Sequence, residues 1–450
     1  MILTPQFKVE QTIALEPSSP AAAKPPVANH LPLPSSETKR WKLGRIGLLL
    51  AVIGPGLMVM LADTDAGSII TAAQSGAQWG FTMILPQLLL IPILYIVQEI
   101  TVRLGLVTGK GHGELIREHF GMGWAMLSVV TLFIACVGAL VTEFAGIAGV
   151  AEMFHIPVWA SVPAVTVLLV MVGLSGSYRR VEKIGLAVGF LEVLFIIAAI
   201  IAKPSLSAMA HGMARFPFRE GNYMFLLAAN VGAVIMPWMV FYQQGAVIDK
   251  RLDRKHLKLQ RWDTKVGAVV TQIIMIAVVI ATAVGLHSSN PNAVLNDVQD
   301  VSRALTPVLG HTSAVILFGL GMAGAAFLAA IVVSLAGAWG LTEALGIKRS
   351  LDMPFKKAKG FYSIYTLAHI GGAAIVLIGV PLVSLMINVE VMNAVLLPIV
   401  LGFLVLLERK ALPKEYRMKG ARKHIAWSLT GITILFGLYT AGVTLMSAVK

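Results

Sequence analysis

The sequence has 450 residues, of which 57% are hydrophobic and only 13% charged, whereas a soluble domain typically carries about 25% charged residues. The formal net charge is +13, but the basic residues lie between long apolar runs, which argues against a nucleic-acid-binding protein. The apolar runs are about 20 residues long, enough to cross a bilayer as a helix. They also lack the alternation of an outer-membrane barrel. The composition therefore predicts an all-α polytopic membrane protein.

Residues 1–42 precede the apolar part of the chain and are rich in Pro, Ala and Ser. They lack the basic segment followed by an apolar segment that defines a signal peptide. We therefore expect a disordered cytoplasmic N-terminal tail, followed by a transmembrane domain over residues 43–450.

The apolar runs predict about eleven transmembrane helices in chain order. Their ranges are approximately 46–76, 81–106, 123–152, 158–175, 183–203, 222–248, 264–286, 313–345, 361–384, 387–407 and 424–448. Lys and Arg are concentrated before the first helix and after the second, fourth, sixth, eighth and tenth. Because basic residues are retained on the cytoplasmic side, this pattern predicts a multi-pass plasma-membrane protein with a cytoplasmic N-terminus and an external C-terminus. The lipid bilayer is its expected surrounding, and no obligatory protein partner is indicated.

The first predicted helix contains two carboxylates, Asp63 and Asp65, near the middle of an apolar run. A charge at this depth costs about 2.5–3.5 kcal/mol, so it needs a reason. The adjoining Gly67 favours an unwound stretch. Free backbone carbonyls and carboxylates together form the oxygen ligands of a cation site.

The sixth predicted helix contains Pro237, which removes one helical hydrogen bond. In lipid, such a break persists only where it is buried in protein or lines a cavity. Breaks in helices one and six, five apart, indicate two inverted repeats with a binding site at the membrane midplane. The repeats would span 46–203 and 222–407, with an extra helix at 424–448.

Three further acids lie in predicted helices: Glu143 in the third, Glu192 in the fifth and Glu390 in the tenth. Glu390 and Asn393 are three apart and share a helix face. Each acid is either part of a polar site or a packing residue at the end of its helix, and the sequence leaves this open. No enzyme motif occurs in a credible context, so we expect a non-enzyme without a resident cofactor.

At these two breaks the chain resembles the natural resistance-associated macrophage protein (NRAMP) family of divalent-metal transporters. The similarity covers about residues 45–410, including Gly54-Pro55-Gly56, the region Asp65–Ser68 and Gly232–Trp238. The resemblance implies the LeuT-like fold of five plus five inverted helices with helices one and six broken.

The resemblance also implies a set of metal ligands. The family signature Asp-Pro-Gly-Asn reads Asp65-Ala66-Gly67-Ser68 here, so Asp65 stands at the metal-binding carboxylate and Ser68 at the Asn ligand. Ala62 and Ala233 stand at positions that offer backbone carbonyls, and Met236 at the position of a thioether ligand.

Several positions depart from the family pattern. Trp238 and Gln243 replace two histidines linked to proton coupling, and Gly146 replaces an acid of helix three. Asp63 and Glu390 add negative charge, so we include them with Gln243 in the predicted site. Oxygen ligands and charge suit a hard, hydrated cation, and this pattern is similar to the NRAMP-related magnesium transporters. The retained Met236 favours softer ions such as Mn²⁺.

The sequence thus predicts an importer of Mg²⁺, and of Mn²⁺ as well, driven by the membrane potential without tight proton coupling. Two alternatives stay open. One is a proton-coupled Mn²⁺/Fe²⁺ symporter, against which the two missing histidines argue. The other is a sodium-coupled amino-acid transporter of the LeuT-like fold, whose substrate carboxylate the acids Asp63 and Asp65 would repel.

Overall fold

The computed structural model describes residues 54–448, apart from 292, 348 and 380. The predicted tail at 1–42 and the start of the first predicted helix lie outside these residues. The described residues belong to one compact unit, and its regular elements are helices.

The helices of the described chain follow the predicted order. The first half contains α2 (Pro55–Asp63), α3 (Ala66–Trp79), α4 (Ile84–Thr108), α5 (His112–Phe120), α6 (Met122–Met153), α7 (Val158–Leu174), α8 (Tyr178–Gly189), α9 (Val193–Ile201) and α10 (Leu206–Met213). The second half contains α11 (Gly221–Val234), α12 (Pro237–Asp249), α13 (Leu257–Thr282), α14 (Val298–Leu309), α15 (His311–Leu345), α16 (Lys359–Leu377), α17 (Leu382–Lys410) and α18 (Gly420–Ala448). Short 3₁₀ or π segments are η1 (Gly80–Met83), η2 (Phe190–Glu192), η3 (Arg254–His256), η4 (Ala283–His287) and η5 (Phe355–Lys357).

Nine helices of the described chain are long and apolar enough to cross a membrane. One of these runs from Ala66 to Thr108 and covers parts of the first two predicted helices, while α7 is a shorter apolar helix of 17 residues. If the run Ala66–Thr108 is divided between the first two predicted helices and α7 is added, the described helices correspond to the eleven predicted ones. The predicted ninth range, 361–384, was wrong at its end because α16 stops at Leu377. Gly379 there has a φ of 85°, and Pro381 precedes α17.

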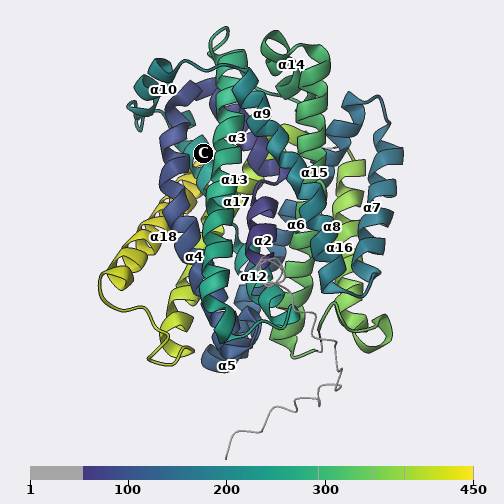
Figure 1. The fold of residues 1–450 in the computed structure, drawn as a ribbon, viewed down its shortest axis with the longest axis vertical. Coiled ribbons are helices and arrows are strands. Elements are labelled where there is room, and N and C mark those ends of the chain that lie inside the picture. Colours follow the sequence, from purple (N-terminus) through teal and green to yellow (C-terminus); the bar gives the residue numbers. More distant parts are fainter. Residues whose placement is uncertain (1–53, 292, 348, 380, 449–450) are drawn as a thin grey trace, which may run out of the picture. The chain divides into compact units, whose positions relative to one another are not determined.

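The broken helices lie in the interior of the bundle. Figure 1 shows α2 at the centre, between α12, α6 and α13. All residues of α2 except Leu57 are buried. Helix α13 packs along both α2 and α3, α15 packs along α6, and α11 packs along α17. The two breaks are thereby enclosed by protein, as irregular backbone at membrane depth requires.

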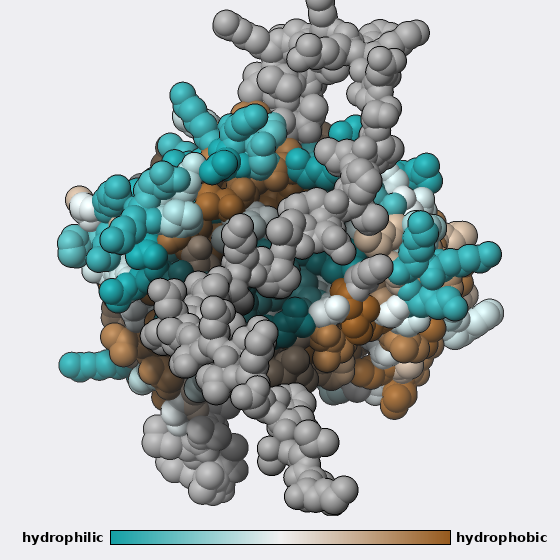
Figure 2. All heavy atoms as spheres, turned by 90° about the horizontal axis from the view of Figure 1, so that it is seen from below, coloured by the Kyte–Doolittle hydropathy of each residue, from teal (hydrophilic) through white to brown (hydrophobic). Residues whose placement is uncertain are grey.

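The basic loops meet at one end of the bundle. Five hydrogen bonds connect these loops and the adjoining helix ends. They run from Gln244 Nε2 to the Lys110 carbonyl (2.7 Å), from Gly113 N to Glu343 Oε2 (3.1 Å), from Tyr178 N to Asp352 Oδ1 (3.1 Å), from Leu351 N to Asp249 Oδ2 (2.9 Å) and from Arg103 Nη1 to the Tyr416 carbonyl (2.9 Å). Figure 2 looks onto this end, where hydrophilic side chains gather around the margin. The predicted charge asymmetry therefore corresponds to one face of the molecule.

Candidate metal site

The first break lies between α2 and α3. Helix α2 ends at Asp63, Thr64 follows it, and Asp65 is the N-cap of α3 with extended backbone angles. The Asp65 Oδ1 atom accepts a hydrogen bond from Ser68 N at 2.8 Å. Asp is among the best N-cap residues because its carboxylate satisfies an amide that the helix leaves free. The carboxylate at the centre of the bundle is therefore also the device that starts the second half-helix.

The second break lies between α11 and α12. Helix α11 ends at Val234, and α12 begins at Pro237. Proline suits this first helical position because its missing N–H would have no partner there. Met236 precedes it with extended backbone angles, φ −90° and ψ 142°. The break predicted from Pro237 is therefore present, two residues long.

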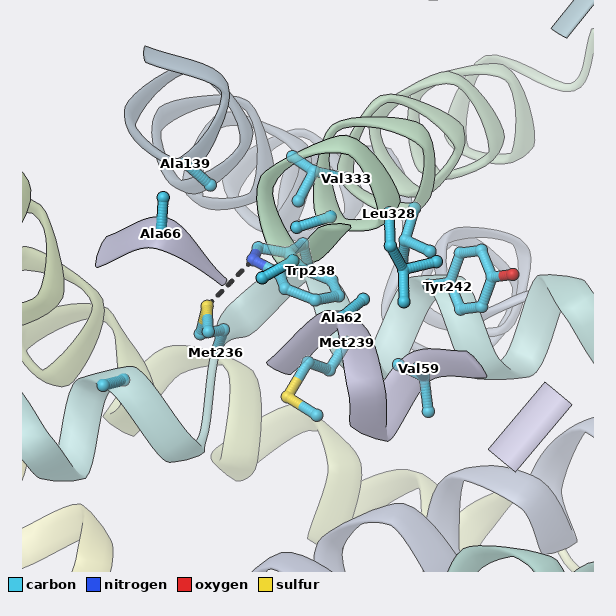
Figure 3. Packing of buried hydrophobic residues seen from close by; sticks show 14 of the residues in the cluster. Val59, Ala62, Ala66, Ala139, Met236, Trp238, Met239, Tyr242, Leu328 and Val333 are labelled. Carbon is cyan, nitrogen blue, oxygen red and sulfur yellow. Dashed lines mark hydrogen bonds between the residues drawn. The ribbon is translucent and has the colours of Figure 1, made fainter. Parts of the chain in front are cut away.

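One hydrogen bond joins the two breaks directly. Ser68 Oγ donates to the Ala233 carbonyl oxygen at 3.0 Å, and both residues are completely buried. Figure 3 draws Ala62 and Ala66, from the two halves of the first helix, in the same buried cluster as Met236 from the second break. Hydrogen bonds thus join three of the residues predicted for the site, Asp65, Ser68 and Ala233. Ala62 lies in the last turn before the first break, and Met236 is the last residue of the second break.

The acids at the first break have oxygen atoms without a hydrogen-bond partner. Both oxygens of Asp63, Oδ2 of Asp65 and Oε1 of Glu390 are buried and unpartnered. In the described part of the chain, none of these side chains forms an ion pair with Lys, Arg or His. Buried charges are stable only when they are paired or coordinate a metal. These oxygens are therefore suited to a cation supplied from outside.

Glu390 faces the start of α3. A Cβ atom added to Gly67 would lie 2.2 Å from Glu390 Oε1, so the absence of a side chain at Gly67 makes room for the carboxylate. The other oxygen, Oε2, accepts a bond from Asn393 Nδ2 at 3.0 Å. The structure therefore places Glu390, as predicted, beside the first break, and gives Gly67 a steric role in addition to its backbone freedom.

Two acids whose roles the sequence left open also reach the first break. Glu143 Oε2 accepts from Ala66 N at 3.2 Å, and Glu192 Oε2 lies 2.5 Å from Thr64 Oγ1. Thr64 was missed altogether, because a threonine in an apolar run gives no signal by itself. The two glutamates could be singled out from the sequence, because a charged residue inside a membrane helix is costly and therefore needs a functional reason.

Two predicted positions have other partners. Gln243 Nε2 donates to Thr264 Oγ1 on α13 at 3.0 Å, and among the described hydrogen bonds none joins Gln243 to the residues of either break. Trp238 Nε1 donates to the sulfur of Met236 at 3.1 Å, as the dashed line in Figure 3 shows. The thioether expected to bind metal thus already accepts one hydrogen bond from its neighbour.

The arrangement is not a cage of charged side chains. Within the described residues, no three His, Cys, Asp or Glu side chains converge to hold a metal ion. A cation at the breaks would need a mixed set of ligands: the Asp65 carboxylate, the Ser68 hydroxyl, backbone carbonyls and the Met236 sulfur.

The fold, with its two broken helices, is that of the LeuT-like class of all-helical membrane proteins. A manganese transporter of Eremococcus coleocola, solved with a bis-isothiourea compound, superposes with a TM-score of 0.75 at 18% identity, over 87% of this chain and 86% of that one. MhsT in complex with L-phenylalanine gives a TM-score of 0.56 at 14% identity, over 88% and 98%. These likenesses show the fold.

Sequence comparison identifies the family. Residues 56–442 match the model of the natural resistance-associated macrophage protein-like family, so this chain belongs to that family and is a transporter rather than an enzyme. The divalent metal cation transporter MntH of Klebsiella pneumoniae strain 342 is 24% identical over 302 residues, covering 64% of this chain and 71% of the relative. MntH of Pectobacterium carotovorum is 25% identical over 305 residues, with the same coverage.

Proposed function

We propose that this protein carries a divalent metal cation across the cell membrane, using the two helix breaks as its binding site. The observation that carries this proposal is the group of buried, unpartnered oxygens on Asp63, Asp65 and Glu390. They lie at a break that Ser68 joins to the second break. The MntH relatives support the same cargo by their names.

Mn²⁺ is the substrate that the relatives favour over the Mg²⁺ expected from the sequence, since one solved neighbour is a manganese transporter. Met236 supports this choice, because a thioether ligand favours transition metals over hard cations. The sodium-coupled amino-acid alternative is supported by the fold alone, and the acids Asp63 and Asp65 argue against a substrate that enters with a carboxylate.

Mg²⁺ is a second candidate, favoured by one specific contact. The Trp238 N–H group points at the Met236 sulfur, and this bond competes with coordination of a metal by the same atom. If the sulfur stays engaged, the remaining ligands are oxygens, which suit Mg²⁺. The preference between Mn²⁺ and Mg²⁺ then depends on whether the Met236 sulfur gives up its hydrogen bond to coordinate the metal.

The driving force is either the membrane potential or a proton gradient. Two charges crossing about 100 mV release about 4.6 kcal/mol, which is sufficient for uptake without protons. A proton route would need a titratable group. Burial lowers the pKa of His112, near the start of α5, to about 4, so its ring is neutral at physiological pH. The buried carboxylates at the first break are candidates for such a group.

Uptake by the purified protein in liposomes tests the proposal. We expect saturable Mn²⁺ uptake that Asp65→Ala abolishes, measured beside Mg²⁺ and Ca²⁺ with and without a pH gradient. Suppression of Mn²⁺ uptake by a large excess of Mg²⁺ would support the second candidate. A wild-type protein that moves none of the three ions would overturn the proposed function.

A further inference from the structure

A cavity of about 500 Å³ lies between α6, α15 and α16, apart from the proposed metal site. These three helices pack against one another, as Figure 1 shows. Three of the lining residues are glycines, Gly337, Gly371 and Gly372, which supply no side chain to fill the space. Other lining side chains are largely exposed, among them Phe133 (63%) and Leu367 (65%). The cavity therefore opens sideways, toward the bilayer.

The wall of this cavity is apolar. Of the described residues that line it, only Cys136 and Ser334 carry a polar group in the side chain. The Cys136 thiol donates to the Val333 carbonyl at 3.5 Å, and the Ser334 hydroxyl donates to the Ala330 carbonyl at 2.7 Å. A buried water typically makes about three hydrogen bonds, and these two groups are already engaged. The occupant that fits such a wall is a hydrocarbon rather than water, an ion or a polar metabolite.

The length of the cavity matches one leaflet of a bilayer. Its lining residues run from Val129 to Leu140 on α6 and from Ile364 to Ile375 on α16. At a rise of about 1.5 Å per residue, each of these stretches is about 17 Å long. The hydrocarbon core of one leaflet is about 15 Å thick. A molecule that fills the cavity from end to end thus spans one leaflet, as the acyl chain of a lipid does.

The volume of the cavity excludes a transmembrane helix as its occupant. A helix with its side chains is about 10 Å across, so a stretch about 17 Å long occupies about 1,300 Å³. The cavity holds less than half of that volume. An extended hydrocarbon chain is much thinner than a helix, so it can enter where a helix from a second copy of this chain cannot.

One end of the cavity lies close to exposed lysines. The cavity ends at Leu341, about one turn before the end of α15, and it begins on α16 at Ile364, between one and two turns after the start of that helix. Lys356, Lys357 and Lys359 are exposed just before or at this start. Lysines near a membrane surface attract anionic lipid headgroups. The charge at this end of the cavity therefore complements a lipid with a negative headgroup.

We propose that this cavity binds one acyl chain of an anionic phospholipid, whose headgroup lies at the lysines that precede α16. The chain fills the space between α6, α15 and α16 and reaches Leu140 at the far end. Leu140 is about one turn from Glu143, whose carboxylate accepts from Ala66 N at the first break. The lipid therefore packs against the part of α6 that contacts the metal site.

A phospholipid that cross-links on illumination tests this assignment. The full-length protein is reconstituted in phosphatidylcholine vesicles that contain phosphatidylglycerol with a diazirine on one acyl chain, and labelled peptides are identified by mass spectrometry. We expect saturable labelling of residues 129–140, 333–341 and 364–375, with at most one lipid per protein chain. Gly371→Phe should reduce this labelling at least tenfold. A Cβ atom at Gly371 meets nothing within 4 Å, so the ring can occupy the cavity without displacing its wall.

Two further comparisons separate the acyl chain from the headgroup. Gly431→Phe on α18 is the matched control, because that position also has nothing within 4 Å and lies outside the cavity; its labelling should equal that of the wild type. Phosphatidylcholine with the same diazirine chain should label the cavity severalfold less than phosphatidylglycerol does. The triple variant Lys356→Gln, Lys357→Gln and Lys359→Gln should remove this difference. It changes only exposed residues, so it gives an answer even if Gly371→Phe does not fold.

Several outcomes would overturn the proposal. Labelling spread evenly over the lipid-facing helices, or unchanged in Gly371→Phe, would mean that the cavity holds no particular acyl chain. Equal labelling of the wild type by the two lipids would overturn the anionic headgroup. Cross-links between two copies of the chain at these peptides would assign the cavity to a contact between copies.

Thermal unfolding in detergent gives a second measure. A lipid that binds only the folded protein raises its melting temperature. Adding phosphatidylglycerol to the wild type should raise this temperature by several degrees, whereas Gly371→Phe, whose cavity is filled by its own side chain, should show no such rise. An equal rise in the two proteins would contradict a lipid in this cavity.

Discussion

Asp65 uses its two carboxylate oxygens for two purposes. Oδ1 caps α3 through Ser68 N, and Oδ2 is unpartnered and available to a cation. The sequence predicted the second purpose from an acid in an apolar run. The first depends on where the second half-helix begins, which a single sequence places only to within a few residues.

The two purposes can be separated by substitution. Asp65→Asn should preserve α3, because Asn caps helices as well as Asp, but lower Mn²⁺ affinity more than about tenfold through loss of the charge. Asp65→Ala should lose both, with a further cost of about 1 kcal/mol in stability. Calorimetric titration and thermal unfolding measure the two effects. Wild-type Mn²⁺ binding by Asp65→Asn would contradict the proposed site.

The Trp238–Met236 contact gives a test of cation choice. Trp238→Phe keeps an aromatic ring at this buried position but removes the N–H group that engages the sulfur. The freed thioether should bind softer cations better, so competition by Mg²⁺ against labelled Mn²⁺ should weaken. Met236→Ala should have the opposite effect. If the two variants compete as the wild type does, the sulfur is not a ligand.

At the scale of elements, both helix breaks were predicted, and the contacts across them were not. Pro237 specifies the second break locally, and Asp65 with Gly67 specifies the first. The approach of Glu390 to Gly67 joins residues more than 300 positions apart, so no local pattern encodes it. The same holds for Glu192 and Thr64, which are 128 positions apart. Their pairing depends on how the helices pack.

The packing of α11 on α17 depends on a glycine at their contact. A Cβ atom added to Gly232 would lie 1.8 Å from the backbone oxygen of Glu390. Because backbone cannot move away as a side chain can, Gly232→Ala should destabilise the protein by about 1–3 kcal/mol. Thermal unfolding in detergent measures this, with Gly402→Ala on α17 as a control, since nothing lies within 4 Å of that position. Equal melting of the two variants would contradict the close contact.

At the scale of the whole molecule, the basic loops share one end, which the sequence predicted to be cytoplasmic. The structure gives a reason for their proximity beyond membrane insertion. Glu99, 1% exposed, accepts from Arg103, from Arg261 Nε at 2.7 Å and from Arg422 Nη2 at 2.9 Å. These residues belong to α4, α13 and α18, so one acid connects three helices. The charge pattern in the sequence predicts that this end is cytoplasmic, and that orientation stays a prediction. The ion pairs of Glu99 could not be predicted, because they depend on how the helices pack.

Removing Glu99 should therefore loosen this end of the molecule. Glu99→Gln leaves Arg103, 2% exposed, with only Glu408 at 3.8 Å and the Tyr416 carbonyl as partners. Breaking a buried ion pair on one side costs about 3–5 kcal/mol, because an uncompensated charge stays behind. Glu118→Gln, which removes the partner of Lys110 from an exposed pair, is the matched control and should cost no more than about 1 kcal/mol. Thermal unfolding of the two variants in detergent decides between these values. The helix breaks do not contact Glu99, so Mn²⁺ affinity at a temperature where both variants stay folded should equal that of the wild type. If Glu99→Gln bound Mn²⁺ weakly but unfolded at the wild-type temperature, Glu99 would affect the metal site and would not act only on stability.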